Sequence, residues 1–94
     1  MDKESLHQLL IDNGYPTHMI EKTAEKIEHF QPKVKKAFIG WVASGQESNI
    51  EVQGYSFARL RQDYGMKAIG AFITLDWLIR DPENATRSLN RGIR

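Results

Sequence analysis

The segment from Gly65 to Ile79 is apolar on nearly every side of a helix, and it constrains the fold more than any other part of the chain. At 3.6 residues per turn its apolar residues form two stripes on roughly opposite sides, one with Met66, Ile69, Gly70, Ile73 and Trp77, the other with Ala68, Phe72, Leu75 and Ile79. A helix with two apolar faces is stable only when other elements cover both of them. The sequence therefore predicts a central core helix over residues 66–80.

The rest of the chain has the pattern of short amphipathic helices. Caps or first-turn residues are predicted at Asp2, Thr17, Pro32, Ser56 and Asp81-Pro82, and glycines that end helices at Gly14, Gly45, Gly65 and Gly92. With 94 residues, 40% hydrophobic and 27% charged, the chain has the size and composition of one globular domain. We expect an all-α fold, a compact single-domain bundle over residues 1–94 with five to six short helices, the apolar one at its centre.

Residues 44–55 are the one stretch with the composition of a loop. Ile50 and Val52 alternate with polar residues there, which predicts one short strand near residues 50–52. The chain offers no obvious mate for this strand. Three alternatives stay open: irregular structure, a small bridge, or pairing with the same segment of another subunit.

Composition excludes several classes of protein. The chain has no cysteine, which rules out a disulfide scaffold and thiolate metal sites and fits a reducing cytoplasm, where we expect the protein to act. The start, Met1 to Ser5, carries two acids and no apolar run, unlike a secretory signal. The apolar run from Ala68 to Leu75 is eight residues long, against about 20 needed to cross a bilayer. We expect no membrane partner.

No group of residues specifies a reaction. His7, His18 and His29 are eleven residues apart, whereas metal ligands on one helix lie three or four apart, so we interpret all three as surface histidines. Asp76 is the only acid within the central helix, and Arg80 four residues later predicts a surface ion pair at the helix edge. We therefore expect no enzyme, with no catalytic residues, no cofactor and no metal site.

Two glycines lie inside predicted helices, where each costs roughly 1 kcal/mol relative to alanine. Gly70 shares a stripe with Ile73 and Trp77, so we predict that another helix backbone or a large ring packs closely over it. Gly40 lies off the apolar stripe of its helix, and the sequence alone offers no reason for it.

Residues 56–73 resemble the spacing of a helix-turn-helix, with a short helix, a Gly-Met turn and a second helix. Residues 54–94 carry a net charge of +3 and residues 1–53 a net charge of −2, which favours an anionic partner for the second half. Against DNA binding, the second helix has almost no polar residue with which to read bases. In this alternative, the residues predicted to meet nucleic acid are Arg59, Arg61, Gln62 and Lys67.

The leading hypothesis is a small intracellular helical module that acts through protein contacts, as an adaptor, an inhibitor or a subunit of an assembly. Ile39 lies outside the main apolar stripe of its helix, and Tyr55 precedes a helix cap at the end of a loop. We predict that both are exposed and bind the partner, because apolar side chains set among charges form interface patches. Self-association through residues 44–55 belongs to the same class.

Overall fold

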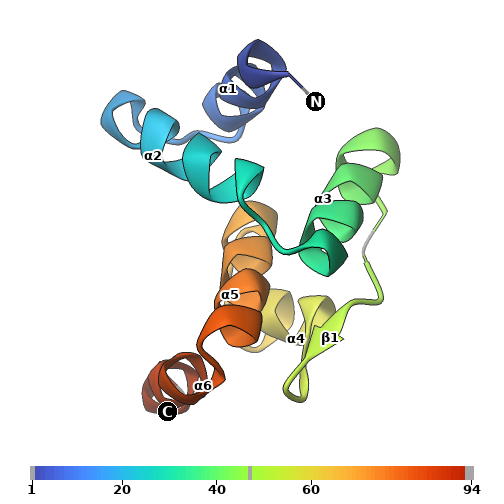
Figure 1. Cartoon of the computed structure of the whole chain (residues 1–94), viewed down its shortest axis with the longest axis vertical. Helices are drawn as coiled ribbons and strands as arrows, with labels where there is room; N and C mark the ends of the chain where they lie inside the picture. Colours follow the sequence, from blue (N-terminus) through green and yellow to red (C-terminus); the bar gives the residue numbers. More distant parts are fainter. Residues whose placement is uncertain (1, 47, 93–94) are drawn as a thin grey trace. The chain divides into compact units, whose positions relative to one another are not determined.

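The computed structural model describes residues 2–46 and 48–92, and within them the fold is all-α, as predicted (Figure 1). Six helices and one two-stranded hairpin are described. In chain order they are α1 (Lys3–Asp12), α2 (Thr17–Glu28), α3 (Pro32–Ser44), β1 (Glu51–Val52), β2 (Tyr55–Ser56), α4 (Phe57–Gln62), α5 (Ala68–Arg80) and α6 (Pro82–Gly92).

The chain divides into two compact units, one ending at Phe30 and the other beginning at Gln31. The first unit holds α1 and α2, which pack against each other, and the second holds the four remaining helices and the hairpin. A single domain over residues 1–94 stays a prediction.

Local signals explain the helices of the first unit. The Asp2 carboxylate accepts a hydrogen bond from the Ser5 N–H at 2.7 Å and caps α1, and Gly14 follows the helix in the left-handed region, with φ of 81°. Thr17 was predicted to cap α2, but it is the first residue of the helix. Pro16 takes the cap position, because its fixed φ of −61° and extended ψ lead directly into the first turn.

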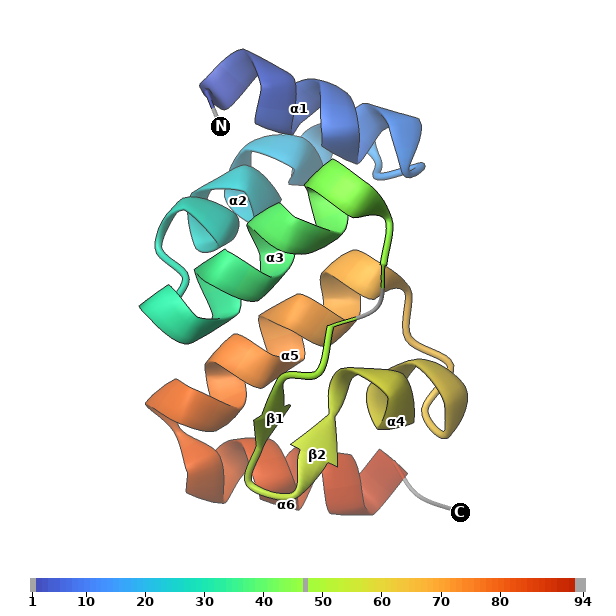
Figure 2. The ribbon, with the colours of Figure 1, turned by 90° about the vertical axis from the view of Figure 1, so that its right-hand side faces the viewer.

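In the second unit, α5 lies at the centre and contacts α3, α4, α6 and β1 (Figure 2). The rings of three fully buried phenylalanines form its core: Phe72 of α5 lies 4.6 Å from Phe57 and 5.5 Å from Phe38, in an edge-to-face arrangement with the latter. Such aromatic pairs stabilise a core beyond the area they bury. The prediction of a central apolar helix is therefore confirmed, although α5 begins at Ala68 rather than at residue 66.

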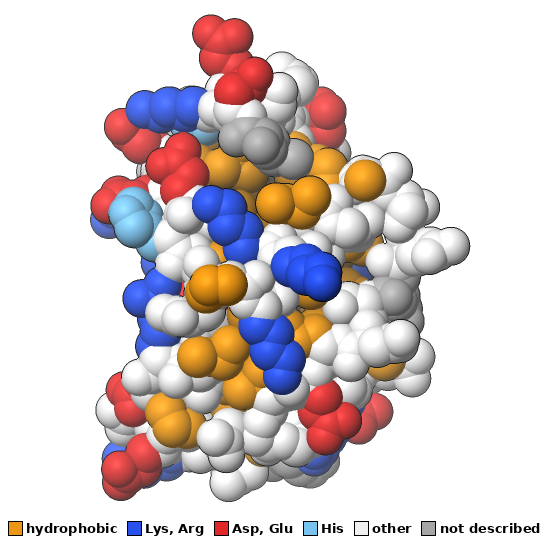
Figure 3. Space-filling view, turned by 45° about the vertical axis from the view of Figure 1, so that its right-hand side comes forward, with side chains coloured by type: hydrophobic (Ala, Val, Ile, Leu, Met, Phe, Trp, Pro, Cys, Tyr) orange, Lys and Arg blue, Asp and Glu red, His pale blue; other side chains and the backbone are white. Residues whose placement is uncertain are grey.

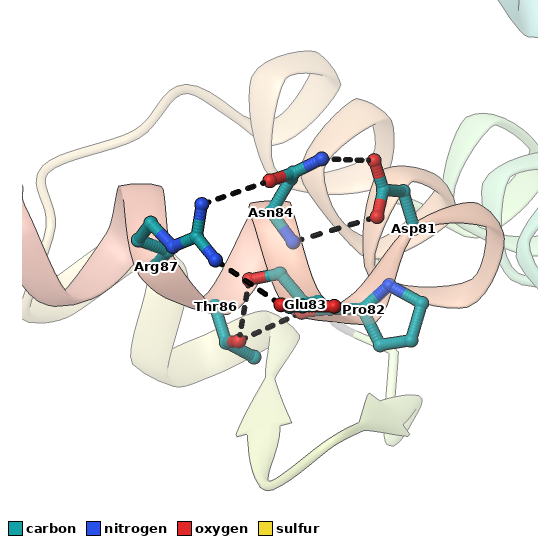
Figure 4. Close-up of polar contacts among 6 residues, drawn as sticks. All are labelled: Asp81, Pro82, Glu83, Asn84, Thr86 and Arg87. Carbon is teal, nitrogen blue, oxygen red and sulfur yellow. Dashed lines mark hydrogen bonds and ion pairs between the residues drawn. The ribbon is translucent and has the colours of Figure 1, made fainter.

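The start of α6 follows the predicted Asp-Pro signal (Figure 4). Pro82 is the first helical residue, and the Asp81 carboxylate accepts hydrogen bonds from Asn84, at 3.4 Å from its backbone N–H and 2.8 Å from its side-chain amide. One turn later Arg87 pairs with Glu83 at 3.1 Å. The bond from the Asn84 backbone satisfies one of the N–H groups that the first turn of a helix leaves unpaired.

The strand near residues 50–52 does have a mate in the chain. Val52 of β1 pairs with Tyr55 of β2 in an antiparallel hairpin, and the connection is the two-residue turn Gln53-Gly54, with φ of 53° and 80°. Positive φ at both central residues matches the twist of paired strands, which is why such turns close tight hairpins. The expectation of a strand without a partner was wrong, because β2 has only two residues and runs directly into α4.

Candidate functional site

One side of α5 is open, contrary to the expectation that both faces are sheathed. We call Gly70, Ile73, Thr74 and Trp77 the α5 face: the first three are half-buried and the Trp77 side chain is 39% exposed. A Cβ atom added at Gly70 would meet nothing within 4 Å, so the predicted close packing over this glycine is also wrong. The reason is that this side of the helix points away from the core around Phe72.

The outer side of α3 carries a second surface, which we call the α3 face: Lys33, Lys36, Ile39, Gly40 and Ala43. All five are exposed, and Ile39 is 46% exposed, as predicted for it. A Cβ atom at Gly40 would also meet nothing within 4 Å. No contact within the described chain therefore explains a glycine in the middle of either helix.

The two glycines share a second feature. The Ser44 hydroxyl donates to the Gly40 carbonyl at 2.8 Å, and the Thr74 hydroxyl donates to the Gly70 carbonyl at 2.9 Å. Each helix therefore presents bare backbone, with its carbonyl already hydrogen-bonded, on a face that also exposes one large apolar side chain: Ile39 directly precedes Gly40 on α3, and Trp77 lies two turns beyond Gly70 on α5. Such a site allows a second backbone or a flat side chain to approach closely.

The charge of α3 runs against its own dipole. The helix contains three lysines and no acid, has no side-chain cap, and carries Lys33 in its first turn, where the helix dipole favours negative charge. Neither Lys33 nor Lys36 forms an ion pair with any carboxylate in the part of the chain that the structure describes. The Lys33 ammonium donates to the backbone carbonyl of Glu51 at 3.1 Å, which leaves its charge in place.

Asp76 supplies the negative charge that the start of α3 lacks. Its Oδ1 accepts the backbone N–H of Gln31, the cap position of α3, at 2.8 Å, and its Oδ2 accepts Nε of Arg80 at 2.7 Å. The predicted Asp76–Arg80 pair is therefore confirmed, but its description as a surface pair is wrong, because Asp76 is only 8% exposed. This acid links the start of α3 to α5, and both of its carboxylate oxygens are already hydrogen-bonded.

Tyr55 is not the exposed partner-binding residue that the sequence predicted. It is 6% exposed, its hydroxyl donates to Oδ1 of Asn90 on α6 at 3.1 Å, and the Arg59 guanidinium lies 4.6 Å from the centre of its ring. The hairpin aims this side chain inward because it pairs with Val52, which is also buried. Burial also raises the pKa of the neighbouring Tyr64 hydroxyl above its ordinary value.

Two of the four residues predicted to meet nucleic acid, Arg59 and Arg61, contact the chain itself. The Arg59 guanidinium donates to the Gly54 carbonyl at 3.2 Å, and that of Arg61 lies 5.8 Å from the Phe57 ring, while Gln62 and Lys67 are exposed. The second helix of the motif, α5, presents Ile73 and Trp77 to solvent where a DNA reader needs polar side chains. DNA binding through residues 56–73 stays a prediction.

A feature that sequence spacing missed is a pocket of about 290 Å³ between α1 and α2, where His7 and His29 lie together. It is also lined by Lys3, Glu21, Ala24, Glu25 and Glu28. His7 is half-buried rather than a surface histidine. Among residues 2–46 and 48–92, no three His, Cys, Asp or Glu side chains are grouped so that they could hold a metal ion. Two helices bring these side chains to one pocket, and spacing along the chain does not reveal such a tertiary arrangement.

Comparison of the chain with protein-family models, curated proteins and solved structures finds no match. In the described residues no helix has both the length and the apolar character needed to cross a bilayer. The function therefore has to be argued from the geometry of the two helix faces.

Proposed function

We infer that the chain is a small helical protein-interaction module, such as an adaptor, an inhibitor or a subunit of an assembly. The observation that carries this proposal is that both mid-helix glycines face open space, each on a helix face that also exposes a large apolar residue, Ile39 or Trp77. Each glycine costs its helix about 1 kcal/mol, and nothing in the described chain uses the space it leaves. A contact outside the chain would use that space, because local rules are most often broken where a protein functions.

The residue types agree with this proposal. Tryptophan is enriched among residues that dominate binding energy at protein interfaces, and the α5 face offers both the flat ring of half-exposed Trp77 and, two turns away, the gap at Gly70. A cytoplasmic location, expected from the absence of cysteine, belongs to the same proposal.

Site-specific photo-crosslinking in the native host tests the proposal. A photoreactive side chain replaces Ile39 in one variant and Trp77 in another, and exposed Lys22 of α2 in a matched control. We expect discrete protein adducts from position 39 or 77 and none from position 22, with self-association read from the mass of the purified chain by light scattering. A monomer that forms no adduct at position 39 or 77 would refute the module. A shift of duplex DNA that is lost in Arg59→Ala would favour the helix-turn-helix alternative instead.

A further inference from the structure

Three features that weaken the isolated fold meet on the α3 face. Gly40 lowers helix propensity in mid-helix, Lys33 places a cation at the positive end of the helix dipole, and Ile39 exposes a large apolar side chain. A Cβ atom added at Gly40 would meet nothing within 4 Å, and Lys33 and Lys36 form no ion pair among the described residues. The negative charge at this end of the helix is the buried Asp76 carboxylate, which bonds Gln31 and not the lysines. Because all three features lie on one side of one helix, they indicate a contact with another molecule at this surface.

We propose that the α3 face binds an acidic, amphipathic helix of a partner protein. This rests on the proposed function and adds the chemistry of the partner and the site. Carboxylates of the partner would pair with Lys33 and Lys36, and an apolar side chain of the partner would pack against Ile39 and Ala43. Both parts of the surface are present: the lysines and the apolar residues are exposed and share one side of the helix.

Charge complementarity predicts that the partner is negatively charged. α3 holds no acid at all, and residues 31–94 carry ten basic and six acidic residues, a net charge of +4. Lys and Arg side chains stand among hydrophobic side chains in the middle of the view in Figure 3. Asp76 accepts the N–H of Gln31 at the start of α3, but it is buried and also bonded to Arg80, so it does not cancel the charge at the surface. Glu51 is exposed and its backbone carbonyl accepts the Lys33 ammonium, but the two side chains form no ion pair among the described residues.

Shape favours a helix as the occupant. Gly40 interrupts the row of side chains along α3, and the gap lies between Lys36 and Ala43, one turn away on either side. A ridge of side chains on a crossing helix fits into such a gap, which is how helices pack closely.

The apolar centre favours protein over the two other anionic classes. A phosphodiester backbone offers nothing to cover Ile39 and Ala43, and most protein contacts to nucleic acid go to phosphate and sugar. A membrane surface requires several large apolar side chains in one plane, whereas Ile39 is the only large one on this face. Both classes are kept as outcomes of the test.

The test uses the full chain and a synthetic peptide of about 18 residues, long enough to hold a helix. Its leucines lie at helical spacing on one side and its other positions are mainly glutamate. A second peptide has lysine in place of glutamate, and a third has serine in place of leucine. Fluorescence anisotropy of the labelled peptides measures the dissociation constants. We expect saturable binding of the first peptide only, weakening as salt shields the charges.

Variants of the protein locate the binding. We expect Lys33→Glu with Lys36→Glu to weaken binding at least about tenfold, while the matched reversal Lys22→Glu with Lys26→Glu on α2 leaves it unchanged. Gly40→Ala separates loss of binding from loss of folding. Because the added Cβ atom meets nothing within 4 Å, we expect this variant to fold and its melting temperature to rise by about 4 °C. We expect its binding of the peptide to weaken nevertheless.

Several outcomes would overturn the proposal. They are no saturable binding of the acidic amphipathic peptide, equal binding of the lysine or serine peptide, an equal loss in the α2 reversal, or full binding by Gly40→Ala. Binding of duplex DNA or of phosphatidylserine vesicles through Lys33 and Lys36, with no binding of the peptide, would assign the face to another class. If position 39 or 77 still forms protein adducts while the peptide fails, the module stands and only the acidic helix is refuted.

Discussion

Asp76→Ala tests how the central helix holds the start of α3. The substitution removes the acceptor of the Gln31 N–H, at 2.8 Å, and the partner of the Arg80 guanidinium, at 2.7 Å. A hydrogen bond to a charged acceptor contributes about 1.5–3 kcal/mol when its donor is left without a partner. The Arg80 side chain is 44% exposed, and a pair of that kind adds only about 0.2–1 kcal/mol because solvent screens it.

Asp76→Ala should therefore lower the free energy of unfolding by about 2–3 kcal/mol. Asp76→Asn has a side chain of similar shape, keeps an oxygen that can accept the Gln31 N–H and loses only the charge. It should lower the free energy of unfolding by about 1 kcal/mol. Urea unfolding followed by tryptophan fluorescence measures both. Trp41 and Trp77 are the two tryptophans of the chain and both lie beyond Gln31, so the signal reports the second unit alone.

Asp63→Ala is the matched control. Asp63 also pairs with an arginine four residues away, Arg59, but at 3.8 Å and with 66% of its side chain exposed. Its loss should change stability by less than about 0.5 kcal/mol. If Asp76→Ala costs no more than Asp63→Ala, the tie between Gln31 and Asp76 does not stabilise the fold and the account of the buried acid is refuted.

Three further substitutions test other contacts of the second unit by the same urea unfolding assay. Gly70→Ala should raise the free energy of unfolding by about 0.5–1 kcal/mol, because the added Cβ meets nothing within 4 Å; a loss of stability would show that something packs there after all. Tyr55→Phe should lower it by about 1 kcal/mol through loss of the bond to Asn90, and an unchanged midpoint would mean that this bond does not hold α6 to the hairpin. Gly54→Ala should lower it by about 1–2 kcal/mol, since φ is 80° there; no effect would contradict the geometry of the turn.

Features that depend on a few consecutive residues could be predicted from the sequence. The Asp2 and Ser56 caps bond N–H groups three residues ahead, at 2.7 and 3.0 Å, and Gly45 ends α3 with φ of 71°, all signals that act within one turn of helix. The central helix was also predictable, because a segment this apolar packs against the core on at least one side, although its stripe with Gly70, Ile73 and Trp77 is partly open.

Features that depend on distant residues could not. A helical wheel says which residues share a side of α5 but not which side the neighbouring helices cover, so the sequence predicts packing over Gly70 where the structure has an open face. Asp76 accepts a hydrogen bond from the backbone N–H of Gln31, 45 residues earlier. Almost every residue has such an N–H group, so the residue type does not identify this donor. Tyr55 was expected to be exposed because the hairpin that turns it inward depends on pairing between two strands of two residues each.

The α3 face was predictable only in part. Ile39 was singled out because it lies off the apolar stripe, and it is exposed. The sequence offers no reason for Gly40. The structure shows open space around it, so no contact within the described chain requires a glycine at this position.

Binding of an acidic helix at the α3 face can be mapped residue by residue. The most direct measurement is a titration of the ¹⁵N-labelled chain with the acidic amphipathic peptide, followed by the backbone amide shifts in two-dimensional NMR spectra. The account predicts that the largest shifts fall at Lys36, Ile39, Gly40 and Ala43. Shifts concentrated at Arg61, Gln62 and Lys67, or no shifts at saturating peptide, would contradict it.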